Sequence, residues 1–221
     1  MRSGKIFGLV PMLAVVVVAV ASSGYAAADT TLCKEPWEPF ACPAGEQYGA
    51  GTELKSILRA GEAEFVAGFL VVKCEQSGMI LKTNAVKGAP LPGEITEFFF
   101  GGCKGCTNVS AIHLNYATEL ERTTLGNGSL TLKAGGAGNP AIKIAGCPGG
   151  ISCIYKAEAL ATFLLGGQPS EYWFSKAPMT KESGGCAAAT GSFSASYHFP
   201  WARETPEMEW IANPIVWVEK A

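Results

Sequence analysis

The stretch Ser192-Phe193-Ser194-Ala195-Ser196-Tyr197-His198-Phe199 alternates strictly between polar and apolar side chains along its whole length. Successive side chains of a β-strand point to opposite faces, so this pattern places one face against a core and the other toward solvent. The stretch therefore predicts a half-buried strand, and it favours an all-β fold for the chain around it.

Further β-prone segments recur from about residue 52 onward, separated by Gly, Pro and Asn. The alternating segments 129–133 and 141–144 flank a glycine-rich loop, and together they predict a hairpin. Two segments, 52–59 and 157–164, are also compatible with short helices. Other strands are expected at residues 64–74, 77–83, 95–100, 111–119, 152–165, 171–175 and 215–219. We expect one antiparallel β-sandwich or barrel of about ten strands.

The N-terminus has the layout of a secretory signal. Two basic residues precede an apolar run at residues 9–21, and small side chains at Ala26 and Ala28 precede Asp29. A positive end, a short apolar helix and small residues at the peptidase subsites are typical of a cleavable signal peptide. The sequence thus predicts a signal peptide at residues 1–28.

The remaining chain, residues 29–221, shows no linker or charge block that would divide it, so we expect a single secreted domain. An uncleaved anchor is the alternative, because residues 6–28 are almost long enough to span a bilayer core of about 30 Å. Pro11 and the short apolar run favour cleavage, which would leave the domain outside the cell and free of the membrane.

Charge argues against nucleic acid as a partner. The chain has 17 basic and 19 acidic residues, and its formal net charge is −2. Binding to nucleic acid depends on clustered phosphate contacts, and the basic residues here are scattered.

All cysteines lie in the predicted secreted part, and an even number in an exported chain indicates disulfides. The eight half-cystine candidates are Cys33, Cys42, Cys74, Cys103, Cys106, Cys147, Cys153 and Cys186. Local spacing favours Cys33 with Cys42 and Cys147 with Cys153, whereas the sequence alone cannot choose among the remaining pairings.

The segment Cys103-Lys104-Gly105-Cys106 is compatible with a redox pair, with half of a zinc site, or with two structural half-cystines. A thioredoxin-like pair should open a helix after a strand, and a zinc ribbon needs a second close pair. Neither context is present, so we expect two half-cystines with separate partners. A bond between Cys74 and Cys103 is favoured for one of them.

Aspartate and histidine are scarce: Asp29 is the one aspartate, and His113 and His198 are the two histidines. A calcium loop needs several Asp or Asn ligands, a Ser-His-Asp triad needs an aspartate, and zincins need a His-Glu-x-x-His helix. We therefore expect no metal, no cofactor and no catalytic residue of these kinds. Both histidines are expected to face solvent.

A hydrolase that uses two glutamates is the enzymatic alternative. Glu94 with Glu97, or Glu119 with Glu121, could supply the two carboxylates of a glycosidase. Such pairs also occur on solvated strand faces, which is the simpler interpretation.

Tryptophan gives the remaining indication of a ligand, because three of the five tryptophans fall within the last 21 residues. Exposed aromatic rings stack on sugars or anchor protein interfaces, although such rings also fill the ends of β-sandwiches. The candidate ligand-binding residues are Trp173, Trp201, Trp210 and Trp217.

Several short motifs carry a resemblance. They are Leu32-Cys33-Lys34, Tyr48-Gly49-Ala50-Gly51-Thr52, Val72-Lys73-Cys74 followed by Ser77-Gly78, and Cys147 and Cys153 followed by Tyr155. In these motifs the chain resembles a group of secreted, cysteine-containing, β-rich proteins of Gram-positive bacteria that have no established activity. The resemblance implies export and β-structure, and it implies nothing about mechanism.

These observations predict a secreted, non-enzymatic binding or structural module that acts outside the cell or at its surface. Its expected ligand is a glycan or another protein. The secreted hydrolase is the alternative.

Overall fold

Almost all regular structure among the described residues is β-strand. A computed structural model describes residues 29–37, 40–124 and 126–221, so the predicted signal peptide at residues 1–28 lies outside the described residues. The strands are β1 (Thr30–Cys33), β2 (Glu53–Leu58), β3 (Ala63–Ala67), β4 (Leu70–Thr83), β5 (Lys87–Gly88), β6 (Leu91–Lys104), β7 (Asn108–Ile112), β8 (Tyr116–Arg122), β9 (Gly128–Lys133), β10 (Ala141–Ala145), β11 (Cys153–Lys156), β12 (Ala159–Leu165), β13 (Glu171–Gly184), β14 (Thr190–Arg203), β15 (Ile211–Ala212) and β16 (Trp217–Lys220). Two 3₁₀ turns occupy Ala44–Glu46 and Pro148–Gly150.

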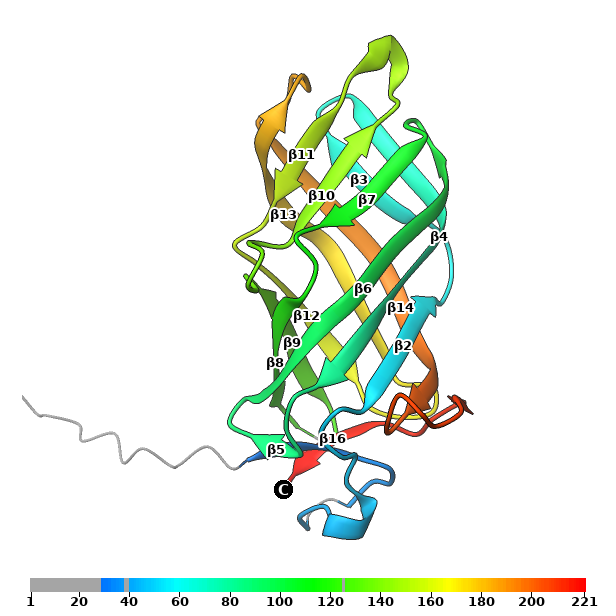
Figure 1. The fold of residues 1–221 in the computed structure, drawn as a ribbon, viewed down its shortest axis with the longest axis vertical. Coiled ribbons are helices and arrows are strands. Elements are labelled where there is room, and N and C mark those ends of the chain that lie inside the picture. Colours follow the sequence, from blue (N-terminus) through cyan, green and yellow to red (C-terminus); the bar gives the residue numbers. More distant parts are fainter. Residues whose placement is uncertain (1–28, 38–39, 125) are drawn as a thin grey trace, which may run out of the picture.

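Eight of these strands close into an antiparallel barrel (Figure 1). The ring runs through β2, β4, β6, β8, β9, β12, β13 and β14, and β14 pairs back onto β2. Closure leaves the ring without a free edge, which removes the usual risk of edge-to-edge association. The predicted all-β class is confirmed, and the architecture is a barrel with additional strands.

Four long strands give the barrel two tiers. β4, β6, β13 and β14 each contain 14 residues and run through both tiers. The lower tier is completed by β2, β8, β9 and β12, whereas β3, β7, β10 and β11 lie between the same long strands in the upper tier (Figure 1). Register shifts in β4, β13 and β14 mark bulges, which bend a strand and let it follow the barrel wall.

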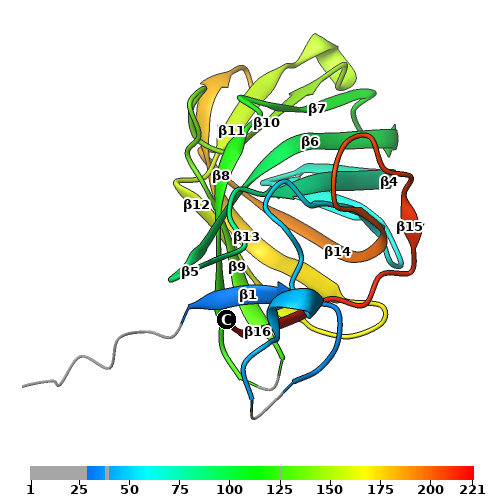
Figure 2. The same ribbon diagram turned by 60° about the horizontal axis from the view of Figure 1, so that its bottom comes forward.

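A small sheet covers the lower end of the barrel. It has the order β16-β1-β5, so it joins both ends of the described domain across the base (Figure 2). Leu32 and Val218 of this sheet are buried. The upper end is formed by loops instead.

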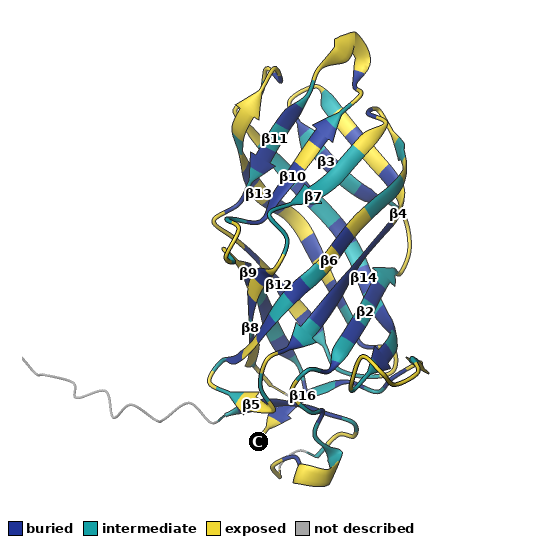
Figure 3. Cartoon of the chain, viewed as in Figure 1, coloured by how far each residue is buried: buried dark blue, intermediate teal, exposed yellow. Residues whose placement is uncertain are grey.

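Buried and exposed residues alternate along the barrel strands (Figure 3). In β14 the side chains of Phe193, Ala195, Tyr197 and Phe199 are buried, as the sequence pattern predicts. Phe193 lies at the centre of an aromatic cluster, with ring centroids 5.7 Å from Phe174, 6.0 Å from Phe98 and 6.1 Å from Phe100. The barrel interior is therefore a packed core.

Two fully buried tyrosines sit side by side in this core. The rings of Tyr172 and Tyr197 stack with centroids 5.2 Å apart. Their hydroxyls form hydrogen bonds with Ser56 at 2.6 Å and Ser77 at 2.8 Å, respectively. These bonds satisfy polar atoms that would otherwise be buried without a partner.

Strand boundaries differ from the sequence expectation. The described residues form sixteen strands rather than about ten, because turns break several expected segments. The segment 64–74 contains the β3–β4 turn at Gly68, and the segment 111–119 turns at His113 and Asn115, which both have positive φ. The segments with a helical alternative, 52–59 and 157–164, contain β2 and most of β12.

The predicted hairpin between residues 129–133 and 141–144 is wrong. β9 pairs with β8 and β12 in the lower tier, whereas β10 pairs with β7 and β11 in the upper tier. The loop between them closes on itself through reciprocal hydrogen bonds between Gly135 and Gly138. It therefore carries the chain from one tier to the other.

Truncation of the central aromatic ring tests the packed core. We expect Phe193→Ala to lower the free energy of unfolding by about 3–5 kcal/mol, since it removes a fully buried ring and leaves a cavity. Urea unfolding measures this change. Phe40→Ala, at an exposed position, is the control and should stay within about 0.5 kcal/mol of the parent; equal losses in both variants would contradict a packed interior.

Alkaline pH should destabilise the barrel through its tyrosines. Burial raises the pKa of Tyr48 to about 12, and burial also holds the pKa of Tyr172 and of Tyr197 above the ordinary value. A pKa that is higher in the folded than in the unfolded chain gives stability that is complete below the unfolded value and is lost as pH rises toward the folded value. Stability should therefore fall above about pH 10.

Ultraviolet absorbance of tyrosinate, recorded as pH rises, measures the pKa values of these tyrosines directly. Burial raises the pKa of all five tyrosines of the described domain, so we expect tyrosinate to appear late, together with unfolding. A single transition near the ordinary tyrosine pKa in a folded protein would contradict the burial of these rings.

Candidate functional site

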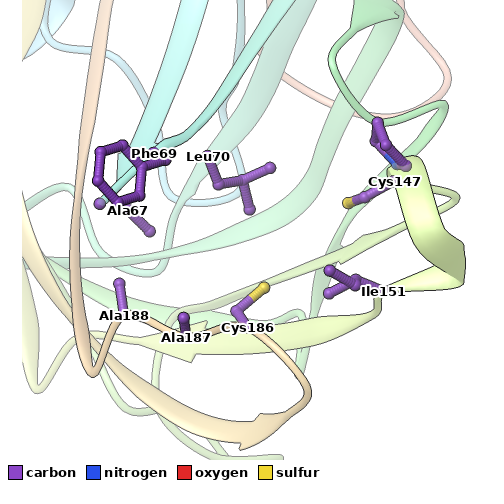
Figure 4. A pocket seen from close by; sticks show the side chains of 10 residues that line it. Ala67, Phe69, Leu70, Cys147, Ile151, Cys186, Ala187 and Ala188 are labelled. Atoms are coloured by element: carbon purple, nitrogen blue, oxygen red, sulfur yellow. The ribbon is translucent and has the colours of Figure 1, made fainter.

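An apolar pocket of about 500 Å³ lies at the upper end of the barrel (Figure 4). Three loops form it: residues 67–70 at the β3–β4 turn, Cys147, Pro148 and Ile151 between β10 and β11, and residues 186–188 between β13 and β14. We call this pocket the mouth pocket. Its walls thus come from segments far apart in the sequence.

The lining of the mouth pocket carries no ionisable side chain. It consists of aliphatic and aromatic groups, glycine, proline and half-cystines, and the Phe69 ring at its rim is fully exposed. Ile151 on the opposite side is also an exposed apolar residue. Concave apolar surface of this kind is a common property of pockets that bind small molecules.

Two buried rings pack together near the β13–β14 loop. Phe65 and Tyr155 are both buried, and their ring centroids lie 4.8 Å apart. The Tyr155 hydroxyl donates to the carbonyl oxygen of Ala188 at 2.8 Å, which ties this layer to the β13–β14 loop. A small cavity in the core, bordered by Val72 and Phe193, measures only about 10 Å³.

Two disulfides fix two of the three loops that line the mouth pocket. Cys106 bonds to Cys147, which joins the β6–β7 turn to the β10–β11 loop. Cys153 bonds to Cys186, which joins the start of β11 to the β13–β14 loop. The β10–β11 and β13–β14 loops are therefore each cross-linked to a neighbouring element, whereas the β3–β4 turn is not.

The predicted pairing of Cys147 with Cys153 is wrong. The two residues flank one turn, but each faces a different neighbour: Cys153 lies opposite Gly184 of β13, and the residues after β10 lie against the β6–β7 turn. Sequence proximity does not reveal these neighbours, because the barrel brings them together from other strands.

The other two disulfides match the sequence expectation. Cys33 bonds to Cys42 at the base, and Cys74 bonds to Cys103 where β4 and β6 pair in direct register. Cys103 and Cys106 thus have separate partners, which confirms that the C-x-x-C segment is structural. All eight cysteines are paired in disulfides.

Two glycines let the rim loops approach their neighbours closely. Gly105 has φ of +89°, and a Cβ there would lie 2.2 Å from the carbonyl oxygen of Val71. Gly184 has φ of +97°, and its Cβ would lie 2.2 Å from the carbonyl oxygen of Ser152. Any other residue would clash, so these glycines set the shape of the rim.

The four candidate tryptophans do not form one surface. Trp201 lies on the outer wall with the Lys55 ammonium 5.3 Å from its ring centroid, and Arg203 lies 4.5 Å from the ring centroid of Trp210. Trp217 belongs to β16 in the base sheet and packs so closely on Gly126 that a Cβ there would lie 2.2 Å from its ring.

Trp173 stands apart from the others, on the outer face of β13. None of the four tryptophans lines the mouth pocket. Their ligand-binding role stays a prediction.

The sequence interpretation missed the mouth pocket. The sequence pattern places Phe69 inside a strand at residues 64–74, where an apolar residue indicates burial. The one available signal was Gly68, because a glycine inside a strand pattern also marks a turn.

The glutamates of the hydrolase alternative lie on the outer wall. Glu94 forms an ion pair with Lys82 at 3.6 Å, and Glu119 forms one with Lys133. Neither these residues nor Glu97 and Glu121 line the mouth pocket. Such ion-paired surface carboxylates match the simpler, solvated interpretation.

The histidines lie apart, His113 in the β7–β8 turn and His198 on the outer face of β14, and both are partly exposed. Within the described ranges, no cluster of three or more His, Cys, Asp or Glu side chains could hold a metal ion.

Comparison with known proteins finds no match: no family model, curated protein or solved structure is similar to the chain. In the part of the chain that the structure describes, no helix has the length and apolar content needed to cross a membrane.

Removal of a rim disulfide tests its role in fixing the mouth pocket. Cys106 and Cys147 are 41 residues apart, so loss of their bond by double replacement with alanine should lower the free energy of unfolding by about 4 kcal/mol. The 9-residue separation of Cys33 and Cys42 predicts a smaller loss of about 2–3 kcal/mol.

Urea unfolding of the two double variants measures the order of these losses. Peptide mapping without reduction is the accompanying control, and a Cys147–Cys153 peptide would contradict the pairing described here.

Proposed function

We propose that the chain is a secreted, non-enzymatic binding module that takes a small, uncharged apolar molecule into the mouth pocket. The observation that carries this proposal is the uniform apolar lining of a concave site that opens at the loop end of the barrel.

Size and chemistry together favour a small molecule. The volume of about 500 Å³ falls within the range of ligand pockets, which is roughly 300–1,000 Å³. A lining without ionisable groups offers no partner for a charged ligand, whose desolvation would then be uncompensated. Selectivity would come from the shape of the pocket.

The cross-linked loops support binding by a preformed site. Disulfides at Cys147 and Cys186 hold two of the three lining loops, and the Lys181 ammonium donates to the Cys186 carbonyl at 2.7 Å. A site that is already ordered loses little conformational freedom when the ligand binds. The exposed Phe69 ring would then be covered.

Action outside the cell rests on two features. Disulfides persist in oxidising compartments, and this domain has four of them. The predicted signal peptide at residues 1–28 would deliver the chain there. Together they support a secreted location.

A matched pair of phenylalanine variants tests the proposal. Phe69 at the mouth and Phe40 near the base are both largely exposed, so each can be replaced by serine with little effect on folding. We expect Phe69→Ser to weaken binding of an uncharged apolar fluorescent dye by about tenfold or more, since a covered ring contributes roughly 1.5–3 kcal/mol. Phe40→Ser should leave binding unchanged.

Fluorescence titration of the dye, with competition by unlabelled apolar molecules, provides the measurement. Ala187→Trp, which fills the pocket, should also abolish binding. The proposal fails if the parent protein binds no apolar probe, or if Phe40→Ser reduces binding as much as Phe69→Ser.

A further inference from the structure

A second concave surface lies on the outer wall of the barrel, away from the mouth pocket. It is an open groove of about 450 Å³, bordered by the β2–β3 turn at Gly61 and Glu62, by residues 173–176 of β13 and by residues 194–196 of β14. We call it the wall groove. Its lining mixes an aromatic ring with hydroxyl, carboxylate and ammonium groups.

From this arrangement we infer that the wall groove binds an uncharged glycan, with Trp173 as the stacking residue. This inference is independent of the apolar ligand proposed for the mouth pocket, because the two sites share no residue.

Trp173, the exposed aromatic residue of the groove, packs against a ring that lies outside the groove. Trp173 lies directly opposite Phe163 of β12, and their ring centroids are 6.0 Å apart in an edge-to-face arrangement. Both rings are more than one-third exposed, at 39% and 37%. Large apolar rings that stay exposed on a solvated wall stand out from the polar residues around them.

The backbone of Trp173 is held in place by a buried hydroxyl. Thr162 Oγ1 accepts a hydrogen bond from the Trp173 amide at 3.1 Å, and it donates to the Trp173 carbonyl oxygen. The ring is therefore presented from a fixed strand position. A fixed aromatic ring binds with less loss of freedom than one on a mobile loop.

A strained bulge brings polar groups beside this ring. The register of β13 shifts between Phe174 and Ala177, so Ser175 and Lys176 form the bulge. Lys176 has φ of +49°, which is rare for a residue other than glycine, and its amide donates to Ser194 Oγ at 3.0 Å. Strained backbone of this kind persists where the surroundings fix it, and it concentrates at functional sites.

The combined chemistry matches a sugar ring. A pyranose offers a face of C–H groups for an aromatic ring, and a rim of hydroxyls that both donate and accept hydrogen bonds. In the wall groove Trp173 supplies the ring, whereas Glu62, Ser175 and Ser196 supply acceptors and donors. The mixed polarity also separates this groove from the mouth pocket, which suits an apolar ligand.

Native gel electrophoresis through soluble neutral polysaccharides tests this inference. With a panel of glucans, mannans and xylans in the gel, we expect at least one polysaccharide to retard the parent protein. Trp173→Ala should weaken that interaction by about tenfold or more, as expected for loss of a central aromatic contact. Phe99→Ala, which removes another exposed outer-wall ring, is the matched control and should migrate like the parent.

A second variant tests the groove if Trp173→Ala fails to fold. Ala60→Arg places a long side chain at an exposed edge of the wall groove and leaves the tryptophan in place, so it should also abolish retardation. Circular dichroism verifies the fold of each variant.

Three results would overturn the inference. They are no retardation by any polysaccharide of the panel, full retardation of a folded Trp173→Ala variant, or an equal loss in Trp201→Ala. The last result would place the glycan on the tryptophan-rich C-terminal segment instead. Phe69→Ser should not alter retardation, and this keeps the test separate from that of the mouth pocket.

Discussion

Closure of the ring of strands at β14 is the constraint on which the rest of the structure depends. This strand pairs with β13 along one side and with β2 and β3 along the other, so it belongs to both tiers. Its inward side chains, among them Phe193 and Tyr197, also occupy the centre of the core. Backbone pairing and apolar burial thus depend on the same residues, and loss of either would open the barrel.

The two ends of the closed barrel also differ in how they are built. The base is covered by a sheet that contains both ends of the described domain, whereas loops alone form the mouth. Loops on a rigid scaffold are the usual place for binding residues, because their sequence is free to vary. Here disulfides at Cys147 and Cys186 restrain the loops, which combines the variability of loops with a fixed shape.

Sequence patterns predicted those features that depend on one chain segment. The alternation at residues 192–199 identified a strand because one of its faces is buried, and the short span from Cys33 to Cys42 identified a local disulfide. The two-tier arrangement leaves no such pattern in the sequence, because each 14-residue strand looks like two or more short strands. The sequence also could not predict that residues 129–133 and 141–144 lie in different tiers.

The candidate sites show the same limit. The tryptophans cluster in sequence, but the fold disperses them over the wall and the base. The mouth pocket combines three distant loops, and its exposed ring, Phe69, has the sequence surroundings of a buried strand residue. Only the three-dimensional arrangement distinguishes an apolar residue that faces a core from one that faces an open pocket.

Amide NMR of the isotope-labelled protein, titrated with a small uncharged alkylbenzene, tests the central claim most directly. If the mouth is a preformed apolar site, shift changes should concentrate at residues 67–70, 147–151 and 186–188 and saturate with a single affinity. Changes confined to the barrel wall or base, or none that saturate, would contradict it.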